Sequence, residues 1–261
     1  MSETKAVTYE RDGHIATITY NRPEALNAIN ADLRRDLNAA WEQLRVDDEA
    51  WVAIVTGAGR AFCAGADLKD PGSSVGNDDH SFWEVPSFTS LESGKEIFKP
   101  VIAAVNGYAI GFGLTMVASC DLVIASDQAQ FGFPEVQLGV PTVQGAVRMP
   151  KMIGWQNAME LLLLGDRVDA HRAKEMGLVM QVVPHDDLMD TARAVAQRLC
   201  DKPAPLAVRA TKEIARRGQE MGFVEAIRFG ETMRKVAGST NDAKAFRDAA
   251  ASGERPTWTA T

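Results

Sequence analysis

The stretch Asn106-Gly-Tyr-Ala-Ile-Gly-Phe-Gly-Leu-Thr115 (NGYAIGFGLT) places three glycines within seven residues, between two apolar segments. The preceding KPVIAAV (Lys99–Val105) is typical of a buried strand, and the following LTMVASC (Leu114–Cys120) is typical of a packed helix. A glycine-rich loop between a strand and a helix can bind a phosphate or a dinucleotide, or it can point backbone N–H groups at another developing negative charge. The choice among these three decides the function.

The known nucleotide-binding patterns do not fit this loop. The phosphate-binding pattern G-x-x-x-x-G-K-[ST] occurs nowhere in the chain. The dinucleotide pattern needs a third small residue, but GAGRAF (Gly57–Phe62) ends in phenylalanine and GFGLTM (Gly111–Met116) ends in methionine. A nucleotide site is therefore not expected here.

A second loop of small residues, Ala64-Gly65-Ala66, also lies between a strand pattern and a polar segment. Two such loops that meet at one point would each supply a backbone N–H, and two donors about 3 Å from one oxygen form an oxyanion hole. Alternatively, the glycines and alanines only allow a strand and a helix to pack closely. Neither loop decides between these two interpretations on its own.

Composition limits the classes of partner. The chain has 261 residues, 46% of them hydrophobic, and a net charge of -7, so it can bury a large core and is not expected to bind nucleic acid or an anionic membrane. The three cysteines, Cys63, Cys120 and Cys200, are widely spaced among apolar neighbours, which favours reduced core thiols over a disulfide framework or a metal site. We see no signal peptide or membrane span in the sequence and expect a cytoplasmic protein.

Strand-like and helix-like patterns alternate along the chain, which predicts an α/β core with parallel pairing. Asn30 is a predicted helix N-cap, and it is followed by one apolar stripe of Leu33, Leu37, Trp41 and Leu44. Asp169 is a second predicted N-cap, with Gly177 at the end of its helix, and Asp67 could be a third. The polar and then aromatic segment Asp70–Ser90 is predicted to cover a pocket, and three helical patterns follow Asp201. The predicted strands are Ile15–Tyr20, Trp51–Gly57, Val101–Gly107, Leu122–Ser126 and Val179–Val183.

Five segments in a fixed order resemble the crotonase, or enoyl-CoA hydratase/isomerase, superfamily, and the similarity covers nearly the whole chain. The resemblance implies a crotonase-like spiral of ββα repeats over residues 1–200, carrying an acyl-CoA site, and a helical oligomerisation subdomain over 201–261. It also implies a homotrimer or homohexamer that acts on an acyl-CoA thioester, without a cofactor or a metal. The segments are NRPEALNAIN (Asn21–Asn30), GAGRAFCAGADLKD (Gly57–Asp70), KPVIAAVNGYAIGFG (Lys99–Gly113), CDLVIAS (Cys120–Ser126) and FGFPEVQLGV (Phe131–Val140).

The resemblance also implies roles for individual residues. The backbone N–H groups of Ala66 and Phe112 correspond to the oxyanion hole, where an acyl-CoA enolate is stabilised. Phe112 departs from the glycine usual in the family, so its ring must point away from the thioester or form part of the acyl pocket. The residues that correspond to the substrate-binding positions are Glu24, Ala25, Leu26, Ala64, Asp67, Leu68, Gly111 and Gly113.

Hydratases of this family use two glutamates for proton transfer. One corresponds to Glu135, whose apolar surroundings are expected to raise its pKa. The other position holds Thr115, whose hydroxyl cannot serve as a general base near neutral pH without a partner. Three hypotheses stay open: a 2-enoyl-CoA hydratase, a double-bond isomerase that uses one carboxylate, and an acyl-CoA-binding protein with little turnover. A residue between Asp78 and Glu84 is a candidate replacement for the missing acid, whereas Asp121 is expected to be structural. An apolar acyl pocket is suggested by Phe82, Trp83, Phe88, Phe112 and Phe133.

Overall fold

The computed structural model describes residues 5–70 and 89–261, which form an α/β structure on two sheets. In this part of the chain, the larger sheet has six strands in the order β1-β2-β3-β5-β7-β10, and the smaller has four in the order β4-β6-β8-β9. The strands are β1 (Val7–Asp12), β2 (Ile15–Tyr20), β3 (Val52–Gly57), β4 (Ala61–Cys63), β5 (Val101–Val105), β6 (Tyr108–Ile110), β7 (Leu122–Ser126), β8 (Gln130–Gly132), β9 (Val168–Asp169) and β10 (Gln181–Val183). The helices are α1 (Ala31–Val46), α2 (Phe112–Val117), α3 (Gln144–Ile153), α4 (Trp155–Leu164), α5 (Ala170–Glu175), α6 (Leu188–Asp201), α7 (Pro205–Gly218), α8 (Phe223–Gly238) and α9 (Asn241–Ser252), with 3₁₀ turns η1 (Pro23–Ala25), η3 (Pro134–Leu138) and η4 (His185–Asp187).

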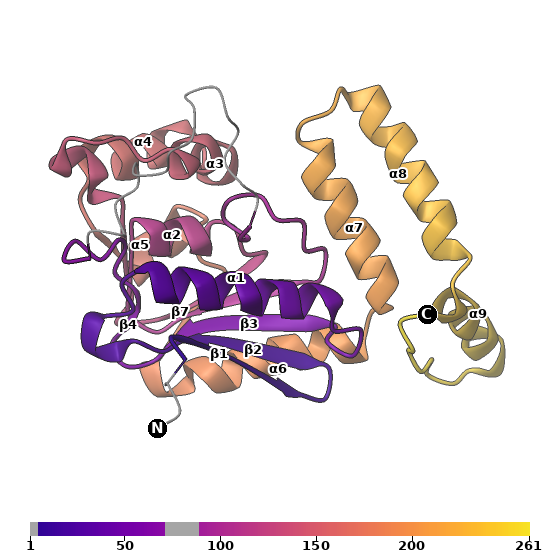
Figure 1. Ribbon diagram of the computed structural model, residues 1–261. Coiled ribbons are helices and arrows are strands. Elements are labelled where there is room, and N and C mark those ends of the chain that lie inside the picture. Colours follow the sequence, from indigo (N-terminus) through magenta and orange to yellow (C-terminus); the bar gives the residue numbers. More distant parts are fainter. Residues whose placement is uncertain (1–4, 71–88) are drawn as a thin grey trace.

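The central strands β3 and β5 of the larger sheet are buried on both faces, because helices cover both sides of the sheet there (Figure 1). Along β3, Val52 and Ile54 join the cluster that includes α6, whereas Ala53 and Val55 join the main core with α1. This alternation follows from the two-residue period of a strand, and a strand buried on both faces has the continuous apolar composition seen here. The central strands therefore fix the rest of the fold in place.

Three predicted helix boundaries are confirmed. The Asn30 side chain accepts a hydrogen bond from the Leu33 amide at 2.9 Å, so it caps α1 as predicted. Asp169 likewise accepts from the Arg172 amide at 2.7 Å, and Gly177 follows α5 with a φ of +86°. Side-chain caps of this kind act locally, so the sequence is sufficient to locate them.

The strands differ from their predictions at the ends and in number. The strand predicted at Val101–Gly107 ends at Val105, and the one predicted at Val179–Val183 begins at Gln181. The three-residue strands β4, β6 and β8 had no counterpart among the predicted elements. Three residues are too few to show a strand period, and long-range pairing alone stabilises such strands.

The chain repeats one arrangement three times to build the smaller sheet. A long strand of the large sheet is followed by a tight turn and a short strand: β3 by β4, β5 by β6, and β7 by β8. The short strands then pair in parallel, β4 with β6 and β6 with β8. This is the predicted spiral, since each repeat adds one strand to each sheet, and a helix or a helical turn follows each of the last two repeats.

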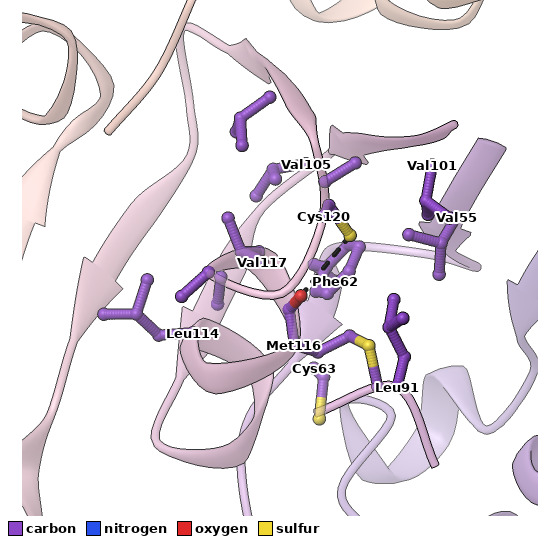
Figure 2. Close-up of a cluster of buried hydrophobic side chains, with 14 of the residues drawn as sticks. Val55, Phe62, Cys63, Leu91, Val101, Val105, Leu114, Met116, Val117 and Cys120 are labelled. Carbon is purple, nitrogen blue, oxygen red and sulfur yellow. Dashed lines mark hydrogen bonds between the residues drawn. The ribbon is translucent and has the colours of Figure 1, made fainter. Parts of the chain in front are cut away.

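Helix α2 packs into the core just after β6. Figure 2 shows Leu114, Met116 and Val117 of α2 in one cluster with Cys63 of β4 and with Leu91. The short helix is thus held by apolar contacts with β4 and with the segment that precedes β5. The position of its first turn depends on these contacts rather than on its own length.

The C-terminal helices α7, α8 and α9 lie to one side of the sheets (Figure 1). The Lys212 ammonium of α7 pairs with the Asp121 carboxylate at 2.6 Å, and that carboxylate accepts from the Val101 amide at 2.7 Å, which confirms Asp121 as a structural residue. Helix α8, by contrast, has no buried residue among its sixteen. Within the described ranges, no helix is both long and apolar enough to cross a bilayer.

We expect Asn27→Ala to destabilise the protein by about 2–4 kcal/mol. Asn27 is fully buried, and its side chain donates to the Ala58 and Ala61 carbonyls at 3.0 and 2.7 Å and accepts from the Arg22 amide at 2.9 Å. Its removal leaves buried polar groups without a partner, each costing about 1–3 kcal/mol. Chemical denaturation measures the loss. Asn21→Ala is the control because Asn21 makes one exposed bond at 3.2 Å, and equal losses in both variants would contradict this role.

Candidate functional site

Three segments of the predicted site follow the carboxyl ends of the three parallel strands β4, β6 and β8. Ala64–Ala66 follows β4, Gly111 and Phe112 follow β6, and Phe133–Glu135 follows β8. Because the three strands pair side by side in parallel, their carboxyl ends lie at one edge of the smaller sheet. The Gly111 amide donates to the Gly132 carbonyl at 2.9 Å, so the pairing continues up to the loops themselves.

The glycines in these loops show how closely the segments approach. A Cβ on Gly111 would lie 3.0 Å from Glu135 Oε1 and 3.9 Å from the Gly65 Cα. A Cβ on Gly65 would lie 4.0 Å from the Phe112 nitrogen. Three segments that are distant in sequence therefore meet within a few ångströms, and only residues without a side chain permit it at Gly65 and Gly111.

The segment Asn21–Asn30, which holds predicted substrate-binding residues, is hydrogen-bonded to the Ala64–Ala66 loop. Ile29 donates its amide to the Gly65 carbonyl at 2.8 Å, and Asp67 donates its amide back to the Ile29 carbonyl at 3.0 Å. The Ala64 amide donates to the Leu26 carbonyl at 3.1 Å. Leu26 and its neighbour Asn27 both have positive φ, which lets the chain turn sharply enough to make these bonds. Leu26 and Ala64 of the predicted binding set are thus adjacent.

The other residues of the predicted binding set lie around this junction. Glu24 and Ala25 are in η1, and the Leu68 side chain is exposed. The Asp67 carboxylate pairs with the Arg22 guanidinium at 3.2 Å and accepts from the Lys69 amide at 3.2 Å. The sequence allowed Asp67 to be a helix N-cap, but no helix begins among residues 68–70; here it closes a local turn and joins the two loops.

Two backbone amides at the meeting point are available to a ligand. Within residues 5–70 and 89–261, no hydrogen bond has the Ala66 or the Phe112 amide as its donor. Ala66 is exposed and Phe112 is half-buried, so both lie at the surface of the loops. The Phe112 ring packs against the core, and the Arg34 guanidinium of α1 lies 5.5 Å from its centroid.

Glu135 supplies a carboxyl group where the three loops meet. It is half-buried in η3, and its Oε2 atom is buried without a hydrogen-bond partner in the described part of the chain. Burial raises the pKa of Glu135, because the ionised form loses its hydration, and this outweighs the opposing effect of its own backbone amide. The carboxyl that the sequence predicted to be perturbed is perturbed in the predicted direction.

Thr115 lies on α2, three residues after Phe112, and its side chain is almost fully buried. Its carbonyl accepts a hydrogen bond from the Ser119 hydroxyl at 2.8 Å, and that hydroxyl accepts one from the Arg148 guanidinium at 2.7 Å. The second guanidinium nitrogen of Arg148 donates to the Glu92 carbonyl at 2.9 Å. A polar network thus joins α2, α3 and the segment before β5.

The sequence analysis missed Glu92. This side chain is 2% exposed, and its carboxylate accepts a hydrogen bond from the Ser90 hydroxyl. Burial raises its pKa to about 7, although Arg34 and Arg148 lower it. No family motif includes Glu92, and a single glutamate in a polar stretch (TSLESGKE) has no sequence signal that separates it from an exposed one.

Several residues of the sequence analysis belong elsewhere. Asp78, Asp79, His80 and Glu84, with the aromatic residues Phe82, Trp83 and Phe88, lie outside the described residues. Phe133, expected to line an acyl pocket, is fully buried, and its ring would meet a Cβ on Gly145 at 2.6 Å. It belongs to the core beneath α3.

We expect Glu92→Gln to become more stable than the parent protein as pH rises from about 5 to 8. The Glu92 pKa is raised from 4.5 to about 7 in the folded state, so folding favours its protonated form, and stability falls as pH rises through this window. Glutamine stays neutral and avoids that loss, which is on the order of 2 kcal/mol at about 1.4 kcal/mol per pKa unit. Thermal melting of both proteins across this range measures it. A difference that is independent of pH would contradict the burial of an ionisable carboxyl here.

Comparisons with known proteins identify the family of this chain. Residues 10–260 match the profile of the family described as enoyl-CoA hydratase/isomerase. The chain is 37% identical to the (E)-benzylidenesuccinyl-CoA hydratase of Thauera aromatica, over 91% of this chain and 93% of the relative. It is 36% identical to the short-chain-enoyl-CoA hydratase of Clostridium acetobutylicum, over 93% of each.

Solved structures share the fold over the full length. The crystal structure of enoyl-CoA hydratase from Mycobacterium tuberculosis H37Rv superposes with a TM-score of 0.89 at 36% identity, covering 99% of this chain and 100% of that one. An enoyl-CoA hydratase/isomerase from Mycobacterium paratuberculosis gives a TM-score of 0.87, again at 36% identity and the same coverage. With a family profile that matches nearly the whole chain, relatives above 30% identity and the crotonase fold itself, this chain belongs to the enoyl-CoA hydratase/isomerase family.

Proposed function

We propose that this protein adds water across the double bond of 2-enoyl-CoA thioesters. The observation that carries the proposal is the meeting of two available amides, from Ala66 and Phe112, with a carboxyl whose pKa is raised, Glu135. Relatives that are 36–37% identical and named as hydratases support the same chemistry. Because the relatives' names cover different acyl groups, the acyl group of this protein's substrate stays open.

The two amides would bind the thioester carbonyl oxygen. As water adds to Cβ, the electrons of the double bond move toward that oxygen, and the two N–H groups stabilise the negative charge of the enolate. Both donors are backbone groups, so the change from glycine to Phe112 keeps the donor. The phenyl ring packs against the core, with the Arg34 guanidinium 5.5 Å from its centroid.

Glu135 would then deliver a proton to Cα. Its Oε1 is the atom that approaches Gly111, the residue before the Phe112 amide, so this carboxyl lies against the predicted oxyanion hole. Cα is bonded to the thioester carbon and is the reacting carbon nearest to that hole. A raised pKa suits this role, since a group that stays partly protonated near neutral pH can both give and take a proton.

An isomerase is the second candidate because Thr115 occupies the position of the other family glutamate. With a single carboxylate, Glu135 could remove a proton from Cα of a 3-enoyl-CoA and return it to Cγ. A third possibility, an acyl-CoA-binding protein without turnover, would leave the cost of burying Glu135 unexplained.

Incubation with 2-enoyl-CoA and 3-enoyl-CoA esters in deuterated water, followed by mass spectrometry, separates the three functions. A gain of one water with deuterium at Cα supports the hydratase. A shifted double bond with deuterium exchange supports the isomerase. Unchanged esters, with binding detected by calorimetry, support the binding protein and overturn both enzymatic proposals.

We expect Glu135→Gln to lower the kcat for hydration of a short 2-enoyl-CoA by about 10²–10⁴-fold, the usual contribution of a general acid–base group. Glutamine has nearly the same shape but cannot transfer the proton, so ester affinity measured by calorimetry should change little. Glu175→Gln is the control, since Glu175 is an exposed carboxylate paired with Arg172 at 3.3 Å. Full activity of Glu135→Gln would remove Glu135 from the mechanism.

We also propose that the protein is a homo-oligomer, a trimer or a dimer of trimers, with α8 in the interface. Exposed apolar side chains on a helix without buried residues are typical of an interaction surface. The large apolar side chains exposed on α8 are Phe223, Val224, Ile227 and Val236.

We expect light scattering at micromolar concentration to give three or six times the monomer mass, because a stable subunit interface would bury these side chains. The double variant Phe223→Asp with Ile227→Asp should run as a smaller species, since it places charge in that interface. Glu225→Gln on the same helix is the control. A monomeric parent protein would overturn the proposal.

A further inference from the structure

The buried carboxyl of Glu92 is bound by groups of its own turn, among them its own amide and the Ser93 amide, and not by a cation among the described residues. In the described chain, no cation lies within 4.0 Å of it, and the nearest guanidinium hydrogen bond, from Arg148, goes to the Glu92 carbonyl rather than to its carboxylate. The Ser90 hydroxyl is its hydrogen-bonded side-chain partner. A buried carboxyl without an ion pair destabilises the protein whenever it ionises. Because proteins keep such a group mainly where its altered pKa serves a function, these groups are concentrated at functional sites.

Glu92 also lies beside the elements that build the predicted oxyanion hole. Its neighbour Leu91 packs in the same apolar cluster as Met116 of α2 and Cys63 of β4 (Figure 2). The carboxyl is close enough to Cys63 to raise the pKa of that thiol, and Cys63 directly precedes the Ala64–Ala66 loop.

Two arginines join Glu92 to the site. Arg34 of α1, which helps to lower the Glu92 pKa, lies 5.5 Å from the centroid of the Phe112 ring. Arg148 of α3 connects the Glu92 carbonyl to Ser119, whose hydroxyl donates to the Thr115 carbonyl. The Glu92 backbone is therefore joined to that of Thr115, the residue at the position of the missing glutamate, through Arg148 and Ser119, and Arg34 acts on the Glu92 carboxyl while it lies beside the Phe112 ring.

We propose that Glu92 is the second acid–base residue of the hydration reaction and supplies, from the segment before β5, the carboxyl that Thr115 lacks. This rests on the proposed hydratase function. The carboxylate of Glu92 takes a proton from the attacking water, and the water oxygen forms its bond to Cβ. The electrons of the double bond pass to the thioester oxygen, held by the Ala66 and Phe112 amides.

The enolate then collapses, and Cα takes its proton from the Glu135 carboxyl. One water has been added, and Glu92 holds one proton while Glu135 has lost one. A proton exchange through solvent restores both groups. We assign the water to Glu92 because its segment is joined to Thr115 of α2 through Arg148 and Ser119, whereas Glu135 lies against Gly111.

The charged and titratable groups around Glu92 come from four elements. Arg34 approaches from α1 and Arg148 from α3, while Tyr20 of β2 and Cys63 of β4 have their own pKa values raised by burial and by the Glu92 charge. Neither Tyr20 nor Cys63 ionises near neutral pH. Glu135 also has a raised pKa, so a limb near pH 7 belongs to Glu92 if Glu92→Gln removes it and to Glu135 if it remains.

The test compares Glu92→Gln, Glu92→Asp and Glu96→Gln with the parent protein on a short 2-enoyl-CoA between pH 5 and 9. Glu96 is on the same segment but exposed, and it pairs with Arg217 at 2.8 Å, so it is a matched control. We expect Glu92→Gln to lower kcat about 10²–10⁴-fold and to remove the fall in kcat/KM below pH 7. Calorimetric affinity for the ester should stay close to the parent value, and thermal melting should show a folded variant that is at least as stable as the parent protein. Glu92→Asp should keep the pH limb at a reduced rate, and Glu96→Gln should match the parent.

Glu92→Gln with parental kcat and an unchanged pH profile would overturn the proposal, as would a loss of rate that only follows a loss of ester affinity. If the glutamine variant does not fold, Glu92→Asp decides: a reduced kcat with the pH limb kept supports the proposal, and an unchanged kcat overturns it. A parent protein that hydrates no enoyl-CoA would overturn the hydratase function and this role together. Fast hydration whose rate is the same in the parent protein and in the Glu92 variants would overturn only the acid–base role of Glu92.

Discussion

The parallel pairing of β4, β6 and β8 is the constraint on which the candidate site depends. Each strand has only three residues, yet the loop after each one contributes a different part of the site: Ala64–Ala66, Gly111 with Phe112, and Glu135. The strands keep their register because they follow long strands that are buried on both faces. A shift in the register of one short strand would separate an amide from the carboxyl, so the large apolar core controls the geometry of a small polar site.

The glycines that raised the first question serve two purposes. Gly107 and Gly113 are required by packing, since a Cβ would come within 2.1 Å of the Arg60 carbonyl and 2.2 Å of the Cys63 carbonyl. Gly111 has a φ of +55° and lies against Glu135, so it turns the chain into α2 and leaves room for the carboxyl. The two interpretations, close packing and a bare loop for an anion, are therefore compatible. Phe112 can replace a glycine because the backbone amide, and not the side chain, is the group in question.

Carboxyl groups with raised pKa values lie on both sides of α2. Glu135 and Glu92 lose hydration in the fold, and neither recovers it through an ion pair in the described residues. Such burial lowers stability above the pKa of the group, but it keeps a carboxyl able to exchange a proton near neutral pH. The cost to folding and the capacity for acid–base chemistry thus have the same physical cause.

The sequence by itself determined the features that depend on local patterns: the α/β class, the caps at Asn30 and Asp169, the apolar strands and the ordered motifs of the family. The family motifs also predicted Ala66, Phe112 and Glu135 as site residues; their roles stay predictions, and the fold brings their segments together. The short strands β4, β6 and β8 and the buried state of Glu92 were decided only by the tertiary structure. A three-residue strand has no period of its own, and whether a glutamate is hydrated or buried depends on which distant segments, here α1, α2 and α3, pack around it.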